Sequence, residues 1–310
     1  MNNVLVTGGC GFIGANLIPM LLGKGYQVRV LDNLSKGDKG YLSNQDVEIF
    51  EGDIRNKSDV AKALTGVDGV IHLAAYGSVV ESVSNPEENF DNNVNGTFVL
   101  LNECRKSVVK KFIFSSTGGA LIGNAVPPVN ENSIPRPISP YGSGKLCCEA
   151  YCSSFAHSYD MSITALRFAN VIGPVSWHKK GAVTVFMKAL LSDKPITIYG
   201  DGSATRDFLH VADLCNGIIR AYEKALPGFN PIHLASGVEV SVKELAEAIM
   251  EVAGSKSHKI EYFDSRKGEV ERNFATYDLA KDVLGFMPSR SLKEGLEETW
   301  QWFVEEHAKS

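Results

Sequence analysis

The segment NVLVTGGCGFIGANL, near the start of the chain, constrains the fold most, because it places glycines directly between an apolar strand and an apolar helix. Gly8, Gly11 and Gly14 follow the pattern G-x-x-G-x-x-G, and Gly9, Gly11 and Gly14 also satisfy G-x-G-x-x-G. Glycine is needed where a turn is tight and the backbone must approach a pyrophosphate closely. The free N–H groups of the helix that begins near Phe12 attract the same anion. The segment therefore predicts a dinucleotide site.

Asp32 ends the second predicted strand, 18 residues beyond Gly14. A carboxylate at this place can accept hydrogen bonds from both ribose hydroxyls of an adenosine, and it repels a 2′-phosphate. No arginine follows in LDNLSKG, although Lys36 adds one positive charge. The alternative is an aspartate that only forms a turn at a strand end. The pattern favours NAD over NADP as the cofactor.

Short apolar runs alternate with longer helical patterns through the first half of the chain. Strands are predicted at Val4–Thr7, Gln27–Leu31, Val47–Glu51, Gly69–Leu73 and Lys111–Ser115, and helices at Phe12–Leu22, Lys57–Leu64, Pro86–Ser107 and Tyr141–Tyr159. Such alternation indicates a parallel sheet covered on both faces. Right-handed connections make this an α/β Rossmann fold with a doubly wound parallel sheet.

The pattern of predicted elements changes after a strand at about Ile163–Phe168, where glycine, proline and short strands become frequent. We expect a smaller, more irregular α/β substrate-binding lobe here, while Val211–Glu223 and Pro231–Ala235 return to the sheet. The predicted NAD-binding domain is residues 1–167 plus about 208–236, and the second lobe is about 168–207 and 237–310. Ligand clefts lie beyond the carboxyl ends of the strands in such sheets, so this lobe roofs the cleft.

The stretch SPYGSGKLCC admits two interpretations. A phosphate-binding P-loop needs G-x-x-x-x-G-K-[ST] after a strand. Here Ser139 stands where the first glycine should be, Leu146 stands where Ser or Thr should bind magnesium, and PRPISP is not a strand. The alternative is a helix that starts at Pro140, which puts Tyr141 and Lys145 on one face.

Tyr141 is then the candidate general base. A phenol has a pKa near 10, and we expect the neighbouring ammonium of Lys145 and a positively charged nicotinamide to lower it. Lys145 can also hold a cofactor ribose. Thr117 follows the predicted strand in KFIFSST and could share a hydrogen bond with Tyr141 and a substrate oxygen. A surface Tyr–Lys pair without function is the alternative.

Composition excludes several classes of protein. The net charge of −5 gives no basic footprint for nucleic acid or for an anionic membrane surface. The start of the chain shows neither a signal peptide nor a long apolar segment, so we expect a cytoplasmic protein. The six cysteines lack paired spacing and are interpreted as reduced thiols. Cys148 and Cys152 could hold a metal but are better explained as core residues, and no metal site is predicted.

Longer motifs extend over nearly the whole chain. They are TGGCGFIG, LDNLSKG, GDI, HLAA, DNNVNGT, SSTGGA, YGSGK, LRFANVIGP, ITIYGDGSATRDFLHVAD and RKGEVERNFA. With them the chain resembles the extended short-chain dehydrogenase/reductase family, and within it the nucleotide-sugar 4-epimerases. The resemblance implies a homodimeric enzyme that binds NAD and a UDP-sugar and epimerises C4 through a 4-keto intermediate. The preferred sugar, UDP-glucose/galactose or the N-acetylhexosamine pair, is left open.

The resemblance also implies roles for individual residues. Thr117, Tyr141 and Lys145 match the catalytic residues. The cofactor contacts that it implies are Gly8, Gly11, Phe12, Ile13, Gly14, Asp32, Asn33, Asp53, Ile54, Leu73, Ala74, Ala75, Asn92, Tyr141, Lys145 and Phe168. The substrate contacts that it implies are Asn170, Arg206 and Arg266 at the diphosphate, Thr197 and Tyr199 at the uracil, Glu269 at the uridine ribose and Asn273 beside the sugar.

Some positions depart from the family pattern. Ile122 replaces a tyrosine that many relatives carry, which changes one wall of the cleft. The segment after Thr117 lacks the Asp-Glu pair of nucleotide-sugar 4,6-dehydratases and the glutamate of decarboxylases, which favours plain epimerisation. Asn273, where a tyrosine would be bulkier, leaves room for an N-acetyl group. A dehydrogenase or reductase with net redox turnover and a non-catalytic NAD-binding protein are the alternatives.

Overall fold

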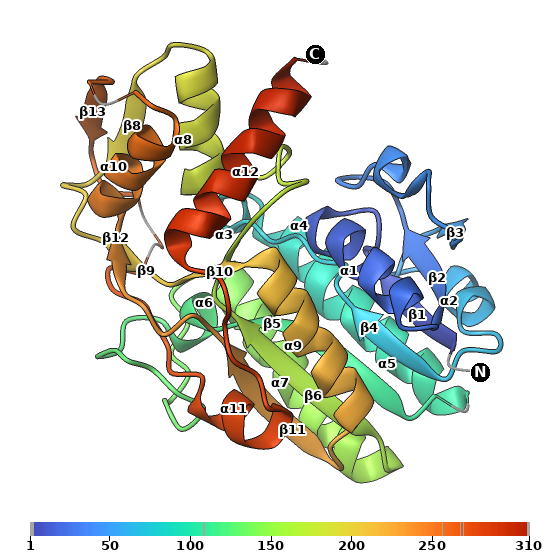
Figure 1. Cartoon of the computed structure of the whole chain (residues 1–310). Helices are drawn as coiled ribbons and strands as arrows, with labels where there is room; N and C mark the ends of the chain where they lie inside the picture. Colours follow the sequence, from blue (N-terminus) through green and yellow to red (C-terminus); the bar gives the residue numbers. More distant parts are fainter. Residues whose placement is uncertain (1–2, 108, 256, 267, 269, 309–310) are drawn as a thin grey trace.

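The computed structural model describes residues 3–107, 109–255, 257–266, 268 and 270–308 (Figure 1). Its centre is a seven-stranded sheet in the order β11-β6-β5-β4-β1-β2-β3, with all neighbours parallel. The strands are β1 (Asn3–Thr7), β2 (Gln27–Asp32), β3 (Glu48–Glu51), β4 (Gly69–His72), β5 (Lys111–Thr117), β6 (Ser162–Phe168) and β11 (Phe229–Leu234). The predicted doubly wound parallel sheet is confirmed.

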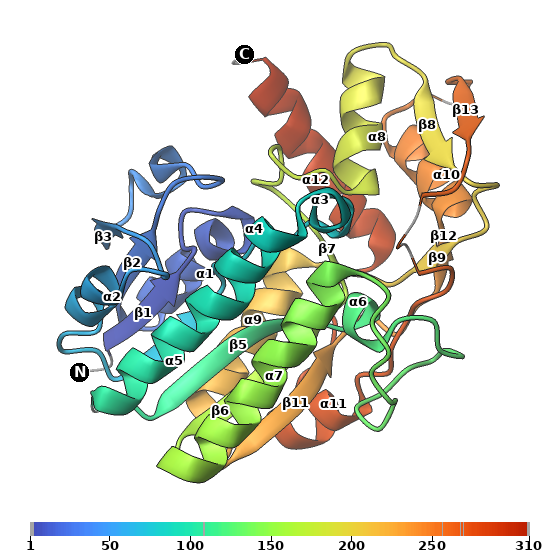
Figure 2. The same cartoon turned by 180° about the vertical axis from the view of Figure 1, so that it is seen from behind.

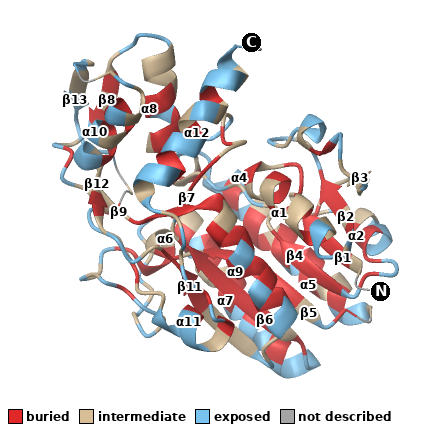
Figure 3. Ribbon diagram, viewed as in Figure 1, coloured by how far each residue is buried: buried red, intermediate tan, exposed pale blue. Residues whose placement is uncertain are grey.

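Helices cover both faces of this sheet, which is why its central strands are apolar without alternation. One face carries α1 (Phe12–Gly23), α9 (Val211–Lys224) and α11 (Asp278–Leu284) (Figure 1). The other face carries α2 (Lys57–Ala63) and the long helices α5 (Gly96–Lys106) and α7 (Pro140–Tyr159) (Figure 2). Every residue of β4 is buried as a result, and the red strands of Figure 3 show the same for the middle of the sheet.

The predicted helix Pro86–Ser107 is not one regular helix. It consists of α4 (Pro86–Phe90), a π-helical turn η2 (Asp91–Asn95) and α5. Asn93, inside the turn, accepts a hydrogen bond from the backbone N–H of Tyr76 at 2.7 Å and donates to its carbonyl at 3.1 Å. The wider turn therefore fastens the loop that follows β4, and π-turns of this kind occur often at functional sites.

The second lobe is more helical than the sequence analysis expected. Its elements, together with the short strands that connect it to the sheet, are β7 (Asn170–Ile172), α8 (Ala182–Leu191), β8 (Ile196–Tyr199), β9 (Thr205–Arg206), β10 (Phe208–His210), β12 (Val240–Ser241), α10 (Val242–Val252), β13 (Ile260–Phe263) and α12 (Leu292–His307). Three further short helices follow strands of the sheet: η1 (Lys39–Leu42) follows β2, α3 (Val79–Ser84) follows β4 and α6 (Gly119–Ile122) follows β5. Helices α8, α10 and α12 share one apolar core with the pair β8–β13. Ser241 and Ser291 each open a helix through a reciprocal capping box, a signal that was available in the sequence.

The two lobes are connected by the chain that passes between them and also by side-chain contacts. Trp302 of α12 lies 6.4 Å, between ring centres, from Tyr41 in the loop after β2. Strands β7 and β10 pair in parallel; β7 leads from β6 toward the second lobe, and β10 leads back into α9 on the sheet. Within the described part of the chain, no helix is long and apolar enough to cross a membrane.

Candidate active site

A cavity of about 640 Å³ opens at the carboxyl ends of the sheet strands, beneath the second lobe. Almost all of the residues predicted from the sequence line it. They are Gly8, Gly11, Phe12, Ile13, Gly14, Asp32, Asn33, Ile54, Leu73, Ala74, Ala75, Asn92, Thr117, Tyr141, Lys145, Phe168, Asn170, Thr197, Tyr199, Arg206, Arg266 and Asn273. Asp53 is not among the lining residues, and Glu269 lies outside the described residues.

The glycine turn between β1 and α1 is closed so tightly that side chains are excluded from it. A Cβ atom at Gly8, where φ is +70°, would lie 2.7 Å from the backbone of Ala74, and one at Gly14 would lie 2.4 Å from the carbonyl oxygen of Gly9. Gly11 caps α1 without a side-chain hydrogen bond to its first N–H groups. The turn thus offers backbone donors at a helix N-terminus to an anion in the cavity.

Asp32 is held at the rim of the cavity by two backbone donors. Its carboxylate accepts a hydrogen bond of 3.0 Å from the N–H of Cys10 and one of 2.8 Å from the N–H of Leu34. The side chain is 8% exposed. Its position at the end of β2, next to the glycine turn, is the one from which a carboxylate can reach a ribose.

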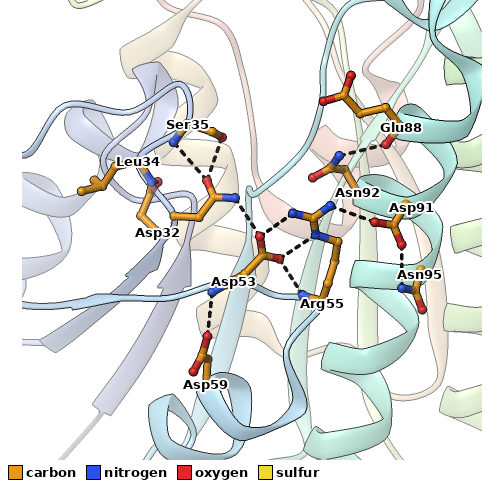
Figure 4. Close-up of polar contacts among 11 residues, drawn as sticks. Asp32, Leu34, Ser35, Asp53, Arg55, Asp59, Glu88, Asp91, Asn92 and Asn95 are labelled. Carbon is orange, nitrogen blue, oxygen red and sulfur yellow. Dashed lines mark hydrogen bonds and ion pairs between the residues drawn. The ribbon is translucent and has the colours of Figure 1, made fainter.

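Asp53 is engaged by other side chains. Figure 4 shows its carboxylate turned toward Arg55, which donates to both oxygens at 2.9 and 2.7 Å and extends to Asp91. Asn33 donates to Asp53 at 3.0 Å. The hydrogen bonds from Arg55, and then those from Asn33, hold the pKa of Asp53 far below its usual range. This network explains why the carboxylate of Asp53 is not on the cavity wall, and its predicted contact with adenine stays a prediction.

The Tyr–Lys stretch forms the start of α7, so GSGK is helical and the P-loop interpretation is wrong. The helix begins at Pro140, with the hydroxyl of Ser139 accepting a hydrogen bond from the N–H of Gly142 at 3.2 Å. Lys145 is 2% exposed, and its ammonium donates to the carbonyl oxygen of Ser115 at 2.6 Å. Tyr141 lies half-buried in the cavity wall.

Burial sets the charge states of this pair. Burial lowers the pKa of Lys145 from 10.5 to about 8. Burial also raises the pKa of Tyr141 above its ordinary value, so the expectation that the neighbouring ammonium lowers it is wrong for the protein alone. The ammonium of Lys145 does not offset this effect of burial, because it donates its hydrogen bond to Ser115 and lies 5.9 Å from the centre of the Tyr141 ring. Among the described residues, no hydrogen bond joins Tyr141 to Thr117, although both line the cavity.

The second lobe contributes cations and aromatic surface to the other end of the cavity. The guanidinium of Arg266 lies 3.5 Å from the ring centre of Tyr199, as in a cation–π contact. Arg206 donates to the carbonyl oxygen of Thr205 at 2.8 Å. The amide nitrogen of Asn273 approaches Gly119 so closely that a Cβ atom there would lie 1.7 Å from it.

Sequence reasoning missed several residues of the wall. Helix α3 reaches the cavity through Val79–Glu81, and its Ser82 hydroxyl accepts a hydrogen bond of 3.1 Å from the N–H of Tyr141. The spacing of Ser78 and Glu81, a start signal for a helix, could have revealed α3. Lys179, in the basic run WHKK, also lines the cavity.

Comparison with known proteins agrees with this geometry. The model of the NAD dependent epimerase/dehydratase family matches residues 4–234. The UDP-glucose 4-epimerase of Mycolicibacterium smegmatis is 35% identical over 310 residues, which cover 96% of this chain and 97% of that protein. A crystal structure of UDP-glucose 4-epimerase from Thermotoga maritima with UDP-glucose superposes with a TM-score of 0.94 at 37% identity, covering 98% of this chain and 99% of the other.

A second solved structure is that of UDP-N-acetylglucosamine 4-epimerase from Methanobrevibacter ruminantium M1 in complex with UDP-N-acetylmuramic acid. It superposes with a TM-score of 0.91 at 34% identity, covering 98% of this chain and 99% of the other. Both solved relatives thus match the sheet and the second lobe together.

Proposed function

The chain belongs to the NAD dependent epimerase/dehydratase family, and from this premise we propose that it is an NAD-dependent UDP-sugar 4-epimerase. The observation that carries the proposal is that Thr117, Tyr141 and Lys145 line the same cavity as the glycine turn after β1. A hydride acceptor and a proton acceptor are the two groups that reversible oxidation of a sugar hydroxyl requires.

The residues at the glycine turn fit NAD. Gly8 and Gly14 line the cavity and approach neighbouring backbone too closely for a side chain, so a pyrophosphate would meet bare backbone there. Asp32, already oriented by two backbone donors, would hold the adenosine ribose. When bound, NAD would supply a reversible hydride acceptor for C4 of the sugar. The NAD-binding domain that we propose is residues 1–167 with about 208–236, and residues of about 168–207 and 237–310 form the sugar-nucleotide lobe.

Tyr141 is the group that moves the proton of the 4-hydroxyl. Its raised pKa keeps the phenol neutral at rest, ready to donate to a 4-keto sugar. Positive charge brought to the cavity favours the phenolate, which accepts a proton from a hydroxyl. Thr117, which ends β5 beside Tyr141 in the cavity wall, orients the sugar oxygen. Lys145, whose pKa burial lowers to about 8, holds the nicotinamide ribose.

The second lobe holds the nucleotide half of the substrate. Arg206 and Arg266 are cations on the cavity wall, and two guanidinium groups suit a diphosphate because each can donate two parallel hydrogen bonds. Tyr199 is partly exposed, and a uracil would stack on the face of its ring that Arg266 does not cover. Anchoring the diphosphate while leaving the hexose loosely held allows the sugar to present either face to the cofactor. Glu269 at the uridine ribose remains a proposal from the sequence alone.

The sugar site has room for an N-acetyl group. Asn273 packs on Gly119 at the wall near Thr117, where a tyrosine would fill more of the cavity. We therefore include UDP-N-acetylhexosamines among the substrates, together with UDP-glucose and UDP-galactose. An enzyme active on UDP-galactose and inactive on UDP-N-acetylgalactosamine would contradict this part of the proposal.

The helices α5 and α7 lie side by side on the face of the sheet that Figure 2 shows, and both carry exposed aromatic residues. Phe98, Tyr151 and Tyr159 are 38%, 41% and 38% exposed, and Phe98 contacts Tyr151 edge to face at 5.3 Å between ring centres. An exposed apolar patch of this kind supports a homodimer formed through these helices.

The six cysteines, all described, are free thiols, which supports the expected cytoplasmic location.

The experiment that tests the function is incubation of the purified protein with UDP-glucose, UDP-N-acetylglucosamine and UDP-glucuronate in separate reactions, followed by chromatography of the sugar nucleotides. We expect conversion to a 4-epimer without stoichiometric appearance of NADH. NADH formed in proportion to product would indicate net redox turnover instead. Absence of conversion of every UDP-sugar would refute the proposal.

A further inference from the structure

A buried ion pair lies directly behind the candidate active site. Glu149, on α7, accepts hydrogen bonds from Arg167 of β6 at 3.1 Å from Nε and 2.8 Å from Nη2. The hydroxyl of Ser116 on β5 donates to the same carboxylate at 2.6 Å. Both charged side chains are only 5% exposed. The contact therefore connects one helix to two neighbouring strands inside the core.

The sequence positions of these residues link them to the reacting groups. Tyr141, Lys145 and Glu149 are spaced four residues apart, so they form one stripe on the buried face of α7. On β5, Lys145 contacts the carbonyl of Ser115, Glu149 contacts the side chain of Ser116, and Thr117 comes next.

The sheet register brings Arg167 to the same point. Ser116 and Arg167 are direct partners across β5 and β6. Two of the guanidinium nitrogens bond to Glu149, while Nη1 has no protein partner among the described residues. Both hydrogen bonds of the Arg167 guanidinium therefore go to a residue of α7.

Such a pair is a poor way to gain stability. The desolvation of two charges in a core offsets their attraction, and apolar residues of similar volume often replace a buried pair without loss of stability. What the pair supplies instead is a unique register, because a bidentate Arg–carboxylate contact tolerates little sliding. A sliding α7 would carry Tyr141 and Lys145 away from Thr117.

We propose that Glu149, held by Arg167 and Ser116, is a positioning residue that fixes α7 on β5, so that Tyr141 and Lys145 keep their places relative to Thr117. This inference rests on the proposed function for the roles of those three residues. Glu149 acts through α7 and touches neither substrate nor cofactor.

The test uses the full-length protein and separates position from stability. The single variant Glu149→Gln keeps the shape and removes the charge, and we expect kcat to fall with KM changed by less than about twofold. The double variant Glu149→Met/Arg167→Met replaces the pair by apolar side chains. Its thermal midpoint should therefore lie closer to that of the wild type than the midpoint of Glu149→Gln does. Its kcat should nevertheless stay on the order of 10²-fold low, because small displacements of catalytic groups cost that much.

Cys152→Ala is the matched control on the same helix. Cys152 is fully buried, so the variant loses packing and leaves the ion pair intact. We expect a lower thermal midpoint with wild-type kcat. If the double variant has the wild-type kcat, or if Cys152→Ala loses as much kcat as Glu149→Gln does, the positioning role is overturned.

Hydrogen exchange supplies a readout that does not depend on turnover. Amides of residues 141–146 should exchange faster in the double variant than in the wild type at equal global stability, and unchanged exchange would count against the inference. If the wild type converts no UDP-sugar, the proposed function is refuted. If the double variant nevertheless shows faster exchange, the anchoring of α7 by the ion pair still holds.

Discussion

The ammonium of Lys145 donates a hydrogen bond of 2.6 Å to the carbonyl oxygen of Ser115. This bond places a cation against the backbone of β5, two residues before Thr117, and 4.7 Å from the ring centre of Phe114. The lysine is therefore shared between a structural contact and the cavity wall. A ligand that draws the ammonium toward itself must compete with this carbonyl, which keeps the charge in place until the ligand is bound.

Replacement of Tyr141 by phenylalanine tests the proton-transfer group. The variant loses only the hydroxyl, so we expect it to fold and to retain NAD. Turnover should fall by on the order of 10²–10⁴-fold, the usual contribution of general acid–base catalysis. Epimerisation assays and the absorbance of bound cofactor measure both properties. Tyr151→Phe, on the exposed face of the same helix, is the control and should keep its activity. Normal turnover in Tyr141→Phe would remove the phenol from the mechanism.

Two glycines of α1 should respond oppositely to alanine. At Gly14 the added methyl would lie 2.4 Å from the carbonyl oxygen of Gly9, whereas at Gly23 nothing lies within 4 Å. Gly14→Ala should lose on the order of 1–3 kcal/mol of unfolding free energy and bind NAD more weakly, since helix and turn must separate. Gly23→Ala should gain on the order of 0.5 kcal/mol from backbone entropy. Urea unfolding and cofactor titration of both variants are the measurements, and equal behaviour would contradict the role assigned to the turn.

Two buried histidines predict how stability depends on pH. Burial lowers the pKa of both His72 and His233 from 6.5 to about 3. The unfolded chain therefore takes up protons first, so the stabilisation is complete above pH 6.5 and is lost as the pH falls toward 3. Each imidazole should contribute a slope of about 1.4 kcal/mol per pH unit within this window.

The variant His233→Asn isolates one of these contributions. It removes one imidazole, so its unfolding free energy should fall less steeply than that of the wild type between pH 6 and 4.5, by about one imidazole's share. Urea unfolding at several pH values gives both slopes, and other titrating groups cancel in the comparison. Identical slopes would show that His233 is not a buried neutral group.

The residue beside Gly119 should control which sugars are accepted. Asn273→Tyr adds bulk to the wall where an N-acetyl group is proposed to fit, so activity on UDP-N-acetylhexosamines should fall at least about tenfold. Activity on UDP-glucose should change much less, because its hydroxyl needs less space. Paired assays of both substrates give the ratio. A variant that loses both activities equally would point to a general defect, and Asn273→Ala then serves as the control that keeps the space open.

The sheet and the site were predictable from the sequence because both depend on local signals. The glycine turn, Asp32 and the Tyr–Lys spacing each sit at the end of a strand or the start of a helix, where residue type is dictated by backbone geometry. The strand order placed them at one edge of the sheet. This explains why residues far apart in sequence were correctly expected in one cavity.

Other features depend on contacts that a single segment does not reveal. The π-helical turn at Asp91–Asn95 exists because Asn93 binds the backbone of Tyr76, which belongs to another loop. In the protein alone, burial raises the pKa of Tyr141, and the four-residue spacing shows that Lys145 is near but not that its ammonium faces Ser115. The sequence analysis does not predict the helices α8, α10 and α12, because their apolar faces form one core only when the three helices pack together.

The strand β11 completes the sheet beside β6, yet about 60 residues separate the two strands, among them the first segment of the second lobe. During synthesis, β6 leaves the ribosome before β11, so β6 has no strand paired to its outer edge until the intervening segment and β11 have also emerged. A product truncated within residues 169–228 would retain SITALRF as an open, apolar border with unpaired backbone groups. Premature termination in this region should therefore yield aggregates, and a soluble fragment requires the chain to continue through Leu234.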